Sequence, residues 1–401
     1  MSELHHLVLI PGFFGFAAIG ELLYFSHVRR YLREACSRVG LNAAIHTVQT
    51  YPTSSLTRRA ERLLEVVSAE TSAEPGPIHF IGHSSGGLDA RLLVSPGVSL
   101  RGDLEVEPLV EKVRSVVMIS TPNWGTPVAS FFTSLFGQKL LQLLSLGTIY
   151  VLRFGRLPSS LLFRLGALFT RLDDLVGWRG SLLDQVFDQL LADFSPERRL
   201  AVEQFLGEIG GDQALMPQLT PEGMDVFNAA TRDRPGVRYG SVLNVARPPG
   251  LLSTASVGLD PYGQTTHALF YGLYRLASRM PASEVPELSQ AQSEALRGAY
   301  GAVPARQAND GVVPTLSQAW GEVIHAARAD HLDVLGHFRD GDRRPPHVDW
   351  LSSGTAFNRG QFEALWTDVV GFVAGRGPTP SPAGGAPRSR VRHLLHYFSR
   401  P

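Results

Sequence analysis

The sequence feature that most restricts the fold is the pentapeptide Gly82-His83-Ser84-Ser85-Gly86, which fits the pattern G-x-S-x-G. It lies between a short apolar strand pattern at 78–81 and an apolar helical pattern at 86–93. A serine on such a strand-to-helix turn sits in a strained backbone, and glycine two positions to either side lets the chain pass closely. The turn exposes the serine hydroxyl beside a helix N-terminus, which favours a developing negative charge. The pattern therefore predicts Ser84 as a nucleophile.

Strand and helix patterns alternate over the first 120 residues and return later in the chain. Strands are expected at 6–10, 43–48, 78–81, 113–119, 237–245 and 322–326, and helices at 19–39, 56–68, 86–93, 181–206 and 361–373. This alternation predicts a mostly parallel sheet with helices on both faces. Together with the serine turn, it predicts the α/β-hydrolase fold, a fold class of α/β architecture.

A long apolar segment interrupts the alternation after residue 127. It contains no uncharged run of about 18 residues, so we expect no membrane-spanning helix. We expect a helical lid insertion over about 127–230 within one catalytic domain, 1–375. Residues 376–401 have the composition of a flexible linker followed by a short basic amphipathic tail, for which weak docking is the simpler interpretation.

Charge and cysteine content exclude several classes of protein. The chain of 401 residues carries 37 basic and 37 acidic residues, which gives no reason to expect nucleic-acid binding. Its single cysteine, Cys36, rules out an intrachain disulfide and is expected to be buried and inert. Residues 1–10 lack the pattern of a secretion signal, so a cytoplasmic location is the simpler expectation, with other export routes left open.

A serine nucleophile needs a base and an acid, which follow it along the chain in this fold. Asp310 lies in a turn, and His331 follows after a stretch that has room for one strand. We expect both side chains at the same end of the sheet as Ser84, where the parallel strands have their carboxyl ends. His337 and His347 are rivals for the base, and Asp260 is the rival for the acid.

An oxyanion site needs two N–H donors near the nucleophile. The amide of Ser85 is one candidate. The amide of Phe13, in the glycine-rich loop 11–15 after the first strand, is the other. We expect Phe14, His83 and Trp124 to line the substrate cleft, with His83 too close to Ser84 in sequence to act as its base.

Taken together, these segments resemble the bacterial true lipases, the triacylglycerol lipases of the Pseudomonas and Burkholderia type. The similar pieces lie in order over about residues 6–335: the Pro-Gly-Phe loop, the serine turn, and the stretches 119–127, 219–228, 309–313 and 331–333. The resemblance implies a Ser84–Asp310–His331 triad, oxyanion donation by Phe13 and Ser85, and a lid after Thr126. It also implies lipid ester substrates. The lid segment up to about residue 170 has only positive charges, on Lys139, Arg153, Arg156 and Arg164, which would suit transient contact with an anionic lipid surface.

The sequence departs from that family at several places. Its loop begins with Pro-Gly rather than His-Gly, and neither the family's disulfide nor its secretion signal is present. The family's structural calcium would use Asp333, but no partner aspartate is identified upstream of Asp310. The calcium and its ligands are therefore left open, and no other cofactor and no obligate protein partner are expected. Alternative functions are a phospholipase or lysophospholipase, a lipid acyltransferase, or a non-catalytic lipid-binding protein on this scaffold.

Overall fold

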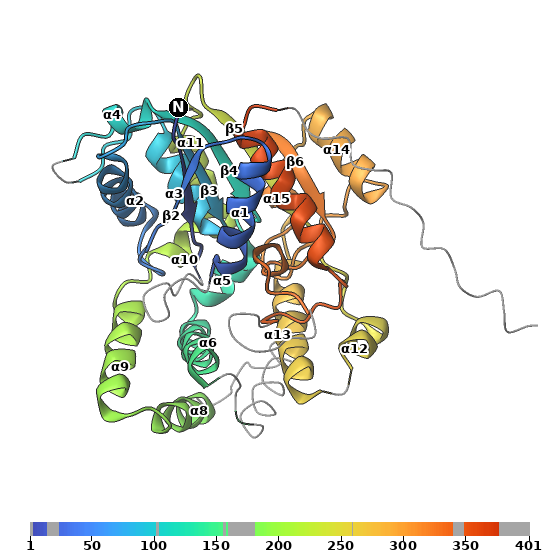
Figure 1. Cartoon of the computed structure of the whole chain (residues 1–401). Helices are drawn as coiled ribbons and strands as arrows, with labels where there is room; N and C mark the ends of the chain where they lie inside the picture. Colours follow the sequence, from blue (N-terminus) through green and yellow to red (C-terminus); the bar gives the residue numbers. More distant parts are fainter. Residues whose placement is uncertain are drawn as a thin grey trace, which may run out of the picture.

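The protein is built around one six-stranded parallel sheet (Figure 1). The computed structural model describes residues 3–13, 24–101, 104–154, 158, 181–258, 260–339 and 349–376. The strand order is β2-β1-β3-β4-β5-β6, and all five pairings are parallel. The strands are β1 (His5–Ile10), β2 (Ala43–Thr47), β3 (Ile78–His83), β4 (Val113–Ile119), β5 (Arg238–Asn244) and β6 (Glu322–Ala327). The parallel sheet predicted from the sequence is confirmed.

Helices cover both faces of the sheet because successive strand residues point to opposite sides. In β1, Leu7 and Leu9 pack with α1 (Ser26–Arg38) and α15 (Arg359–Val373) in one core. Val8 and Ile10 belong to a second core with α2 (Leu56–Thr71) and α3 (Ser85–Val94). The short helix α4 (Glu107–Val110) adds Leu109 and Val110 to this second core. Both faces of the central strands are therefore buried under helices, which explains their nearly continuous apolar sequence.

A helical insertion separates β4 from β5. Its described helices are α5 (Pro127–Phe132), α6 (Leu135–Phe154), α8 (Ser181–Ala192), α9 (Pro196–Gly211), α10 (Leu215–Gln218) and α11 (Pro221–Ala230). Residues 155–157 and 159–180 of the predicted lid lie outside the described residues. In Figure 1, α6, α8 and α9 lie below the sheet. The stretch predicted as one helix over 181–206 is two helices. Pro196 begins the second helix, because proline has no N–H with which to continue the first.

Three helices between β5 and β6 were not predicted from the sequence. They are α12 (Leu251–Val257), α13 (Pro261–Ala277) and α14 (Gln290–Tyr300). Local start signals were present: Asp260 caps α13 directly before a proline, and Ser289 forms a capping box with Gln292 on α14. Single 3-10 turns lie between α13 and α14 at Ala282–Glu284, before β6 at Leu316–Gln318, and after β6 at Asp333–Leu335.

Two sequence predictions reach beyond the described residues. The helix expected from residue 19 begins at Ser26 in the structure, and 14–23 lie outside the described residues. Nearly all of the predicted linker and tail, 377–401, also lies outside them. Of the helices that are described, none is both long enough and apolar enough to cross a bilayer.

Candidate functional site

The serine turn has the strained geometry that its sequence predicts. β3 ends at His83 and α3 begins at Ser85, with Ser84 between them at φ 55° and ψ −133°. This region of φ is costly for a residue that has a Cβ. A Cβ at Gly82 would lie 2.3 Å from the Gly87 nitrogen, and one at Gly86 would lie 2.3 Å from the Ile10 oxygen. The glycines therefore make the tight strand-to-helix turn sterically feasible.

The loop after β1 lies directly against Ser84. A Cβ at Gly12 would be 2.4 Å from Ser84 Cβ and 3.0 Å from its Oγ, so only glycine fits there. The preceding carbonyl, Pro11 O, accepts a hydrogen bond of 2.9 Å from Arg59 Nη2. Arg59 is fully buried and forms an ion pair with Asp89 of α3 at 2.7 Å. The loop is thus fixed to the helix that begins at the nucleophile.

Asp310 and His331 are brought together as expected. His331 Nδ1 lies 2.8 Å from Asp310 Oδ2, and both side chains are almost completely buried. A second contact joins their backbones, because the His331 N–H donates to Asp310 O at 2.9 Å. β6 occupies the sequence between them, as predicted. Asn309 O accepts from Ala246 N, which places this turn just after the end of β5.

Further donors fix the Asp310 carboxylate. Oδ1 accepts the N–H groups of Val312 and Val313 at 2.9 and 2.7 Å, and Oδ2 also accepts from Gln318 Nε2 at 3.2 Å. A carboxylate surrounded by donors acts as an acceptor, so His331 carries its proton on Nδ1. The opposite nitrogen, His331 Nε2, is buried and has no hydrogen-bond partner among the described residues. It is the one free to take up a proton.

The rival residues have other contacts. Asp260 Oδ2 accepts the Gly263 N–H at the start of α13, which is a capping role. His337 Nε2 lies 3.4 Å from Tyr24 O, and its ring packs edge-on against His27. His347 lies outside the described residues.

His83 is completely buried beside His331, with ring centroids 4.6 Å apart. Its Nε2 is 2.8 Å from His331 O, and its Nδ1 is 2.6 Å from the Tyr24 hydroxyl. Burial, followed by the charge of His331, lowers the pKa of His83 well below its ordinary value. His83 is therefore a neutral imidazole whose two nitrogens are both bonded to protein groups.

The remaining predicted site residues are placed as follows. Ser85 is the first residue of α3, where backbone N–H groups have no partner within the helix. Phe13 is buried and belongs to the hydrophobic core that the insertion forms. The Trp124 indole donates to Ala319 O at 3.1 Å and packs against Trp320. Phe14 lies outside the described residues.

Three residues of the site, Tyr24, Arg59 and Asp89, were not predicted from the sequence. For Arg59 a signal existed, because it lies within the apolar stripe of α2 formed by Leu56, Ala60 and Leu63. A charge in such a stripe must find a buried partner. Nothing in the local sequence distinguishes Tyr24 from other aromatic residues near the start of a helix.

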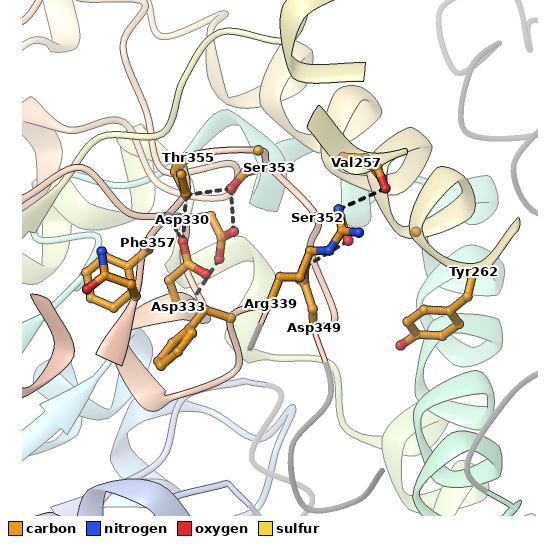
Figure 2. A pocket seen from close by; sticks show the side chains of 15 residues that line it. Val257, Tyr262, Asp330, Asp333, Arg339, Asp349, Ser352, Ser353, Thr355 and Phe357 are labelled. Carbon is orange, nitrogen blue, oxygen red and sulfur yellow. Dashed lines mark hydrogen bonds between the residues drawn. The ribbon is translucent and has the colours of Figure 1, made fainter. Parts of the chain in front are cut away.

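A separate cavity of about 300 Å³ is lined in part by Asp330 and Asp333, which flank His331 in the sequence (Figure 2). Three of its lining residues are carboxylates: Asp330 and Asp333 are buried, and Asp349 is partly exposed with its Oδ1 buried. Burial raises the pKa of Asp330 to about 6 and that of Asp349 to about 7, the latter with a contribution from the charge of Asp330. Burial and both neighbouring charges raise the pKa of Asp333 well above its ordinary value. These three residues are called the acid pocket below.

The acid pocket contains Asp333, the residue that the family resemblance assigns to calcium. Asp333 Oδ2 accepts from Asp330 N and from Thr355 Oγ1, each at 2.9 Å. Asp330 in turn accepts from Ser353 Oγ at 2.6 Å and from two backbone N–H groups of its own loop. Within the described part of the chain, no three His, Cys, Asp or Glu side chains converge as metal ligands. These residues alone do not form the expected site, and calcium stays an untested expectation.

No family model and no curated protein match the chain. Solved structures of similar fold include a metagenomic carboxyl esterase, at 17% identity and a TM-score of 0.46, covering 92% of this chain and 75% of that one. The lipase of Staphylococcus hyicus has 14% identity, a TM-score of 0.49 and coverages of 92% and 95%. Lipase 1 from Pelosinus fermentans has 17% identity, a TM-score of 0.48 and coverages of 88% and 97%.

At such identities and TM-scores these likenesses say nothing about the reaction of this protein. The fold class is assigned from the sheet and the serine turn of this protein. A parallel sheet with helices on both faces, in which β3 leads through a strained Ser84 into α3, is the predicted α/β-hydrolase fold.

Proposed function

We propose that this protein is a serine hydrolase that cleaves carboxylic esters of lipids. The observation that supports this most directly is the buried Asp310–His331 pair at 2.8 Å, at the carboxyl end of the sheet, where the strained Ser84 directly precedes α3. A strained serine, a histidine with an unpaired ring nitrogen and a hydrogen-bonded carboxylate are the parts that acyl transfer requires. The proposal rests on these residues and not on the similar structures.

In the proposed reaction, Ser84 Oγ attacks the ester carbonyl carbon while His331 Nε2 accepts the hydroxyl proton. Asp310 Oδ2 holds the Nδ1–H of the imidazole, which fixes the productive tautomer and stabilises the imidazolium that forms. The resulting tetrahedral intermediate places a negative charge on the former carbonyl oxygen. We propose that the amides of Ser85 and Phe13 donate to this oxygen.

The intermediate collapses when His331 returns the proton to the departing alcohol, which leaves an acyl group on Ser84. A water molecule then attacks the acyl carbon, with His331 again as base, and the carboxylic acid is released. This reaction uses only protein groups and water.

The lipid part of the proposal rests on the helical insertion. Phe13 and Leu88 share one hydrophobic core with α6 residues Leu140, Leu143 and Leu146 and with residues of α8. Apolar helices packed beside the nucleophile loop suit an acyl chain and a lid that opens at a lipid surface. Lys139 pairs with Asp184 at 3.0 Å, so this lysine is less available to attract an anionic surface than its sequence suggested.

Hydrolysis of p-nitrophenyl esters from acetate to palmitate tests the function. Wild type should cleave the series, and Ser84→Ala should lose on the order of 1,000-fold or more in kcat. Ser130→Ala, at an exposed serine of α5, is the matched control and should keep full activity. A fluorophosphonate probe should label Ser84 in wild type and nothing in Ser84→Ala.

The chain-length profile separates the two parts of the proposal. Activity that rises toward long chains supports a lipid substrate and a lid role for the insertion. Activity limited to acetate and butyrate would leave an esterase and remove the lipid part. A wild type that cleaves no ester and takes up no fluorophosphonate would refute the proposed reaction.

A further inference from the structure

A continuous chain of hydrogen bonds runs from the loop after β1 to the backbone of His331. Gly12 N lies 3.1 Å from the Tyr24 hydroxyl, which lies 2.6 Å from His83 Nδ1. His83 Nε2 lies 2.8 Å from His331 O. These bonds join three parts that the proposed reaction must keep in register. They are the loop after β1 with the proposed donor Phe13 (called the oxyanion loop), the residue before the nucleophile, and the segment that carries the base.

The two ends of this chain determine every proton in it. A backbone N–H only donates and a carbonyl oxygen only accepts. His83 Nε2 must therefore donate to His331 O, so Nδ1 of the neutral ring must accept. Tyr24 consequently donates its hydroxyl proton to His83 and accepts from Gly12. No alternative arrangement satisfies all three contacts, so the chain has one direction.

Both side chains are in surroundings that make a lost partner costly. His83 has no exposed surface, and burial raises the pKa of the Tyr24 hydroxyl, which keeps it protonated as a donor. A buried polar group without a hydrogen-bond partner is unfavourable. The three hydrogen bonds give a partner to the Tyr24 hydroxyl and to both ring nitrogens of His83. Gly12 also packs directly on Ser84, so a shift of the loop reaches the nucleophile itself.

We propose that Tyr24 and His83 are positioning residues that hold the oxyanion loop and the backbone of His331 in register with Ser84. The inference rests on the proposed function. It replaces substrate contact as the role of His83, because both of its nitrogens are bonded to protein groups. Neither residue touches the reacting atoms, and each acts through the groups it holds.

Tyr24→Phe is the primary test, because it keeps the ring and removes the hydroxyl that links Gly12 to His83. The active sites of each variant are first titrated with a fluorophosphonate, and kcat is expressed per titrated site. We expect kcat per site to fall by roughly 10- to 100-fold with KM changed less than about threefold, since misplacing an oxyanion donor weakens transition-state binding selectively. Affinity for a boronic acid, which mimics the tetrahedral intermediate, should fall in parallel with kcat.

Tyr31→Phe is the matched control. Tyr31 is a nearly buried tyrosine whose hydroxyl bonds to Thr367 Oγ1 at 2.7 Å. Like Tyr24 it makes a tertiary hydrogen bond, but this contact joins α1 to α15 and includes no residue of the proposed site. Tyr31→Phe should lower the unfolding temperature about as much as Tyr24→Phe does, while leaving kcat per site unchanged. A purely structural role for Tyr24 predicts that same result for Tyr24→Phe, with fewer active sites but normal turnover at each of them.

A second variant keeps the test decisive if Tyr24→Phe folds poorly. His83→Gln retains a side-chain N–H that can reach His331 O, whereas His83→Leu removes both contacts. We expect His83→Gln to recover part of the kcat lost in His83→Leu. Adding Tyr24→Phe to His83→Leu should then cost much less than it does in wild type, because the link it removes is already broken.

The outcomes are distinguishable from failure of the proposed function. Wild type that hydrolyses esters through Ser84, with Tyr24→Phe and His83→Leu at normal kcat per site, overturns the positioning role alone. Additive effects of the two variants also overturn it. Wild type that neither hydrolyses esters nor reacts with fluorophosphonate overturns the function, and the positioning role with it.

Discussion

Asp310 has four donors around one carboxylate, two at each oxygen, so replacing Oδ2 removes the acceptor of His331 and of Gln318. In Asp310→Asn, one oxygen becomes an NH2 group, which cannot accept the Nδ1–H of His331. His331 would then favour the other tautomer, with its proton on the nitrogen that should receive one from Ser84. We expect kcat to fall on the order of 1,000- to 10,000-fold, measured on a p-nitrophenyl ester.

A second aspartate–histidine pair, which is partly buried, provides the control for that substitution. Asp368 Oδ2 lies 2.8 Å from His325 Nδ1, between α15 and β6. Asp368→Asn makes the same chemical change in a similar pair outside the proposed site. Its kcat should stay within about twofold of wild type, and comparable losses in both variants would indicate a general effect on folding.

At Gly12 the addition of one carbon atom is also expected to lower the activity. The methyl group of Gly12→Ala would lie 2.4 Å from Ser84 Cβ and 2.9 Å from His83 O, and neither atom belongs to a flexible chain end. The loop must move, so we expect a fall in kcat of roughly 100-fold and a lower unfolding temperature. Gly298→Ala on α14, where a Cβ meets nothing within 4 Å, should change neither activity nor stability for the worse.

At the scale of elements, the Arg59–Asp89 pair joins α2 to α3 and also holds the loop after β1. Both side chains have no exposed surface, and Arg59 donates to Tyr51 O and Pro11 O as well as to the carboxylate. Arg59→Leu would leave the Asp89 carboxylate buried without its partner. We expect a loss of about 3–5 kcal/mol in the free energy of unfolding, measured by urea denaturation.

The neighbouring arginine on α2 tests whether burial causes this loss. Arg58 also forms an ion pair, with Asp212 at 3.4 Å, but its side chain is 55% exposed. Arg58→Leu should therefore cost less than about 1 kcal/mol. Equal effects of the two substitutions would mean that the pair contributes no more than a surface contact.

At the scale of the whole molecule, the acid pocket links stability to pH. The folded state keeps Asp349 protonated up to about pH 7 and Asp330 up to about pH 6, whereas unfolded carboxyl groups lose their protons near pH 4. Between these values the folded state binds more protons, so stability falls as pH rises. We expect the unfolding temperature, measured with EDTA present, to drop by a few degrees from pH 5 to pH 8.

Asp349→Asn should flatten that dependence, because the amide carries no charge at any of these pH values. Its unfolding temperature should exceed that of wild type at pH 8 and approach it at pH 5. Asp225→Asn, at an exposed aspartate of α11, should leave the slope unchanged. A wild type whose stability rises steadily from pH 5 to pH 8 would show that these carboxylates are ionised when folded.

The sequence by itself determined the features whose signals are local. Gly82 beside Ser84 predicts the strained turn, because the clash it avoids involves Gly86 and Gly87, only a few positions away. The clash avoided at Gly86 is with Ile10 of β1, which only the folded chain brings there. Alternating apolar stretches predict the parallel sheet, and the order of acid and base along the chain indicated Asp310 and His331. The pairing of these two in space, at 2.8 Å, agrees with that order.

Only the tertiary structure decided which distant groups meet. Tyr24, His83 and His331 come from three separate segments, and nothing in their spacing indicates the hydrogen bonds between them. The raised pKa values of the acid pocket likewise come from desolvation of Asp330, Asp333 and Asp349 where two separate segments meet, which no local pattern encodes. Hydrogen-bond partners and desolvation depend on which surfaces the folded chain brings together, whereas a turn or a strand depends mainly on its own few residues.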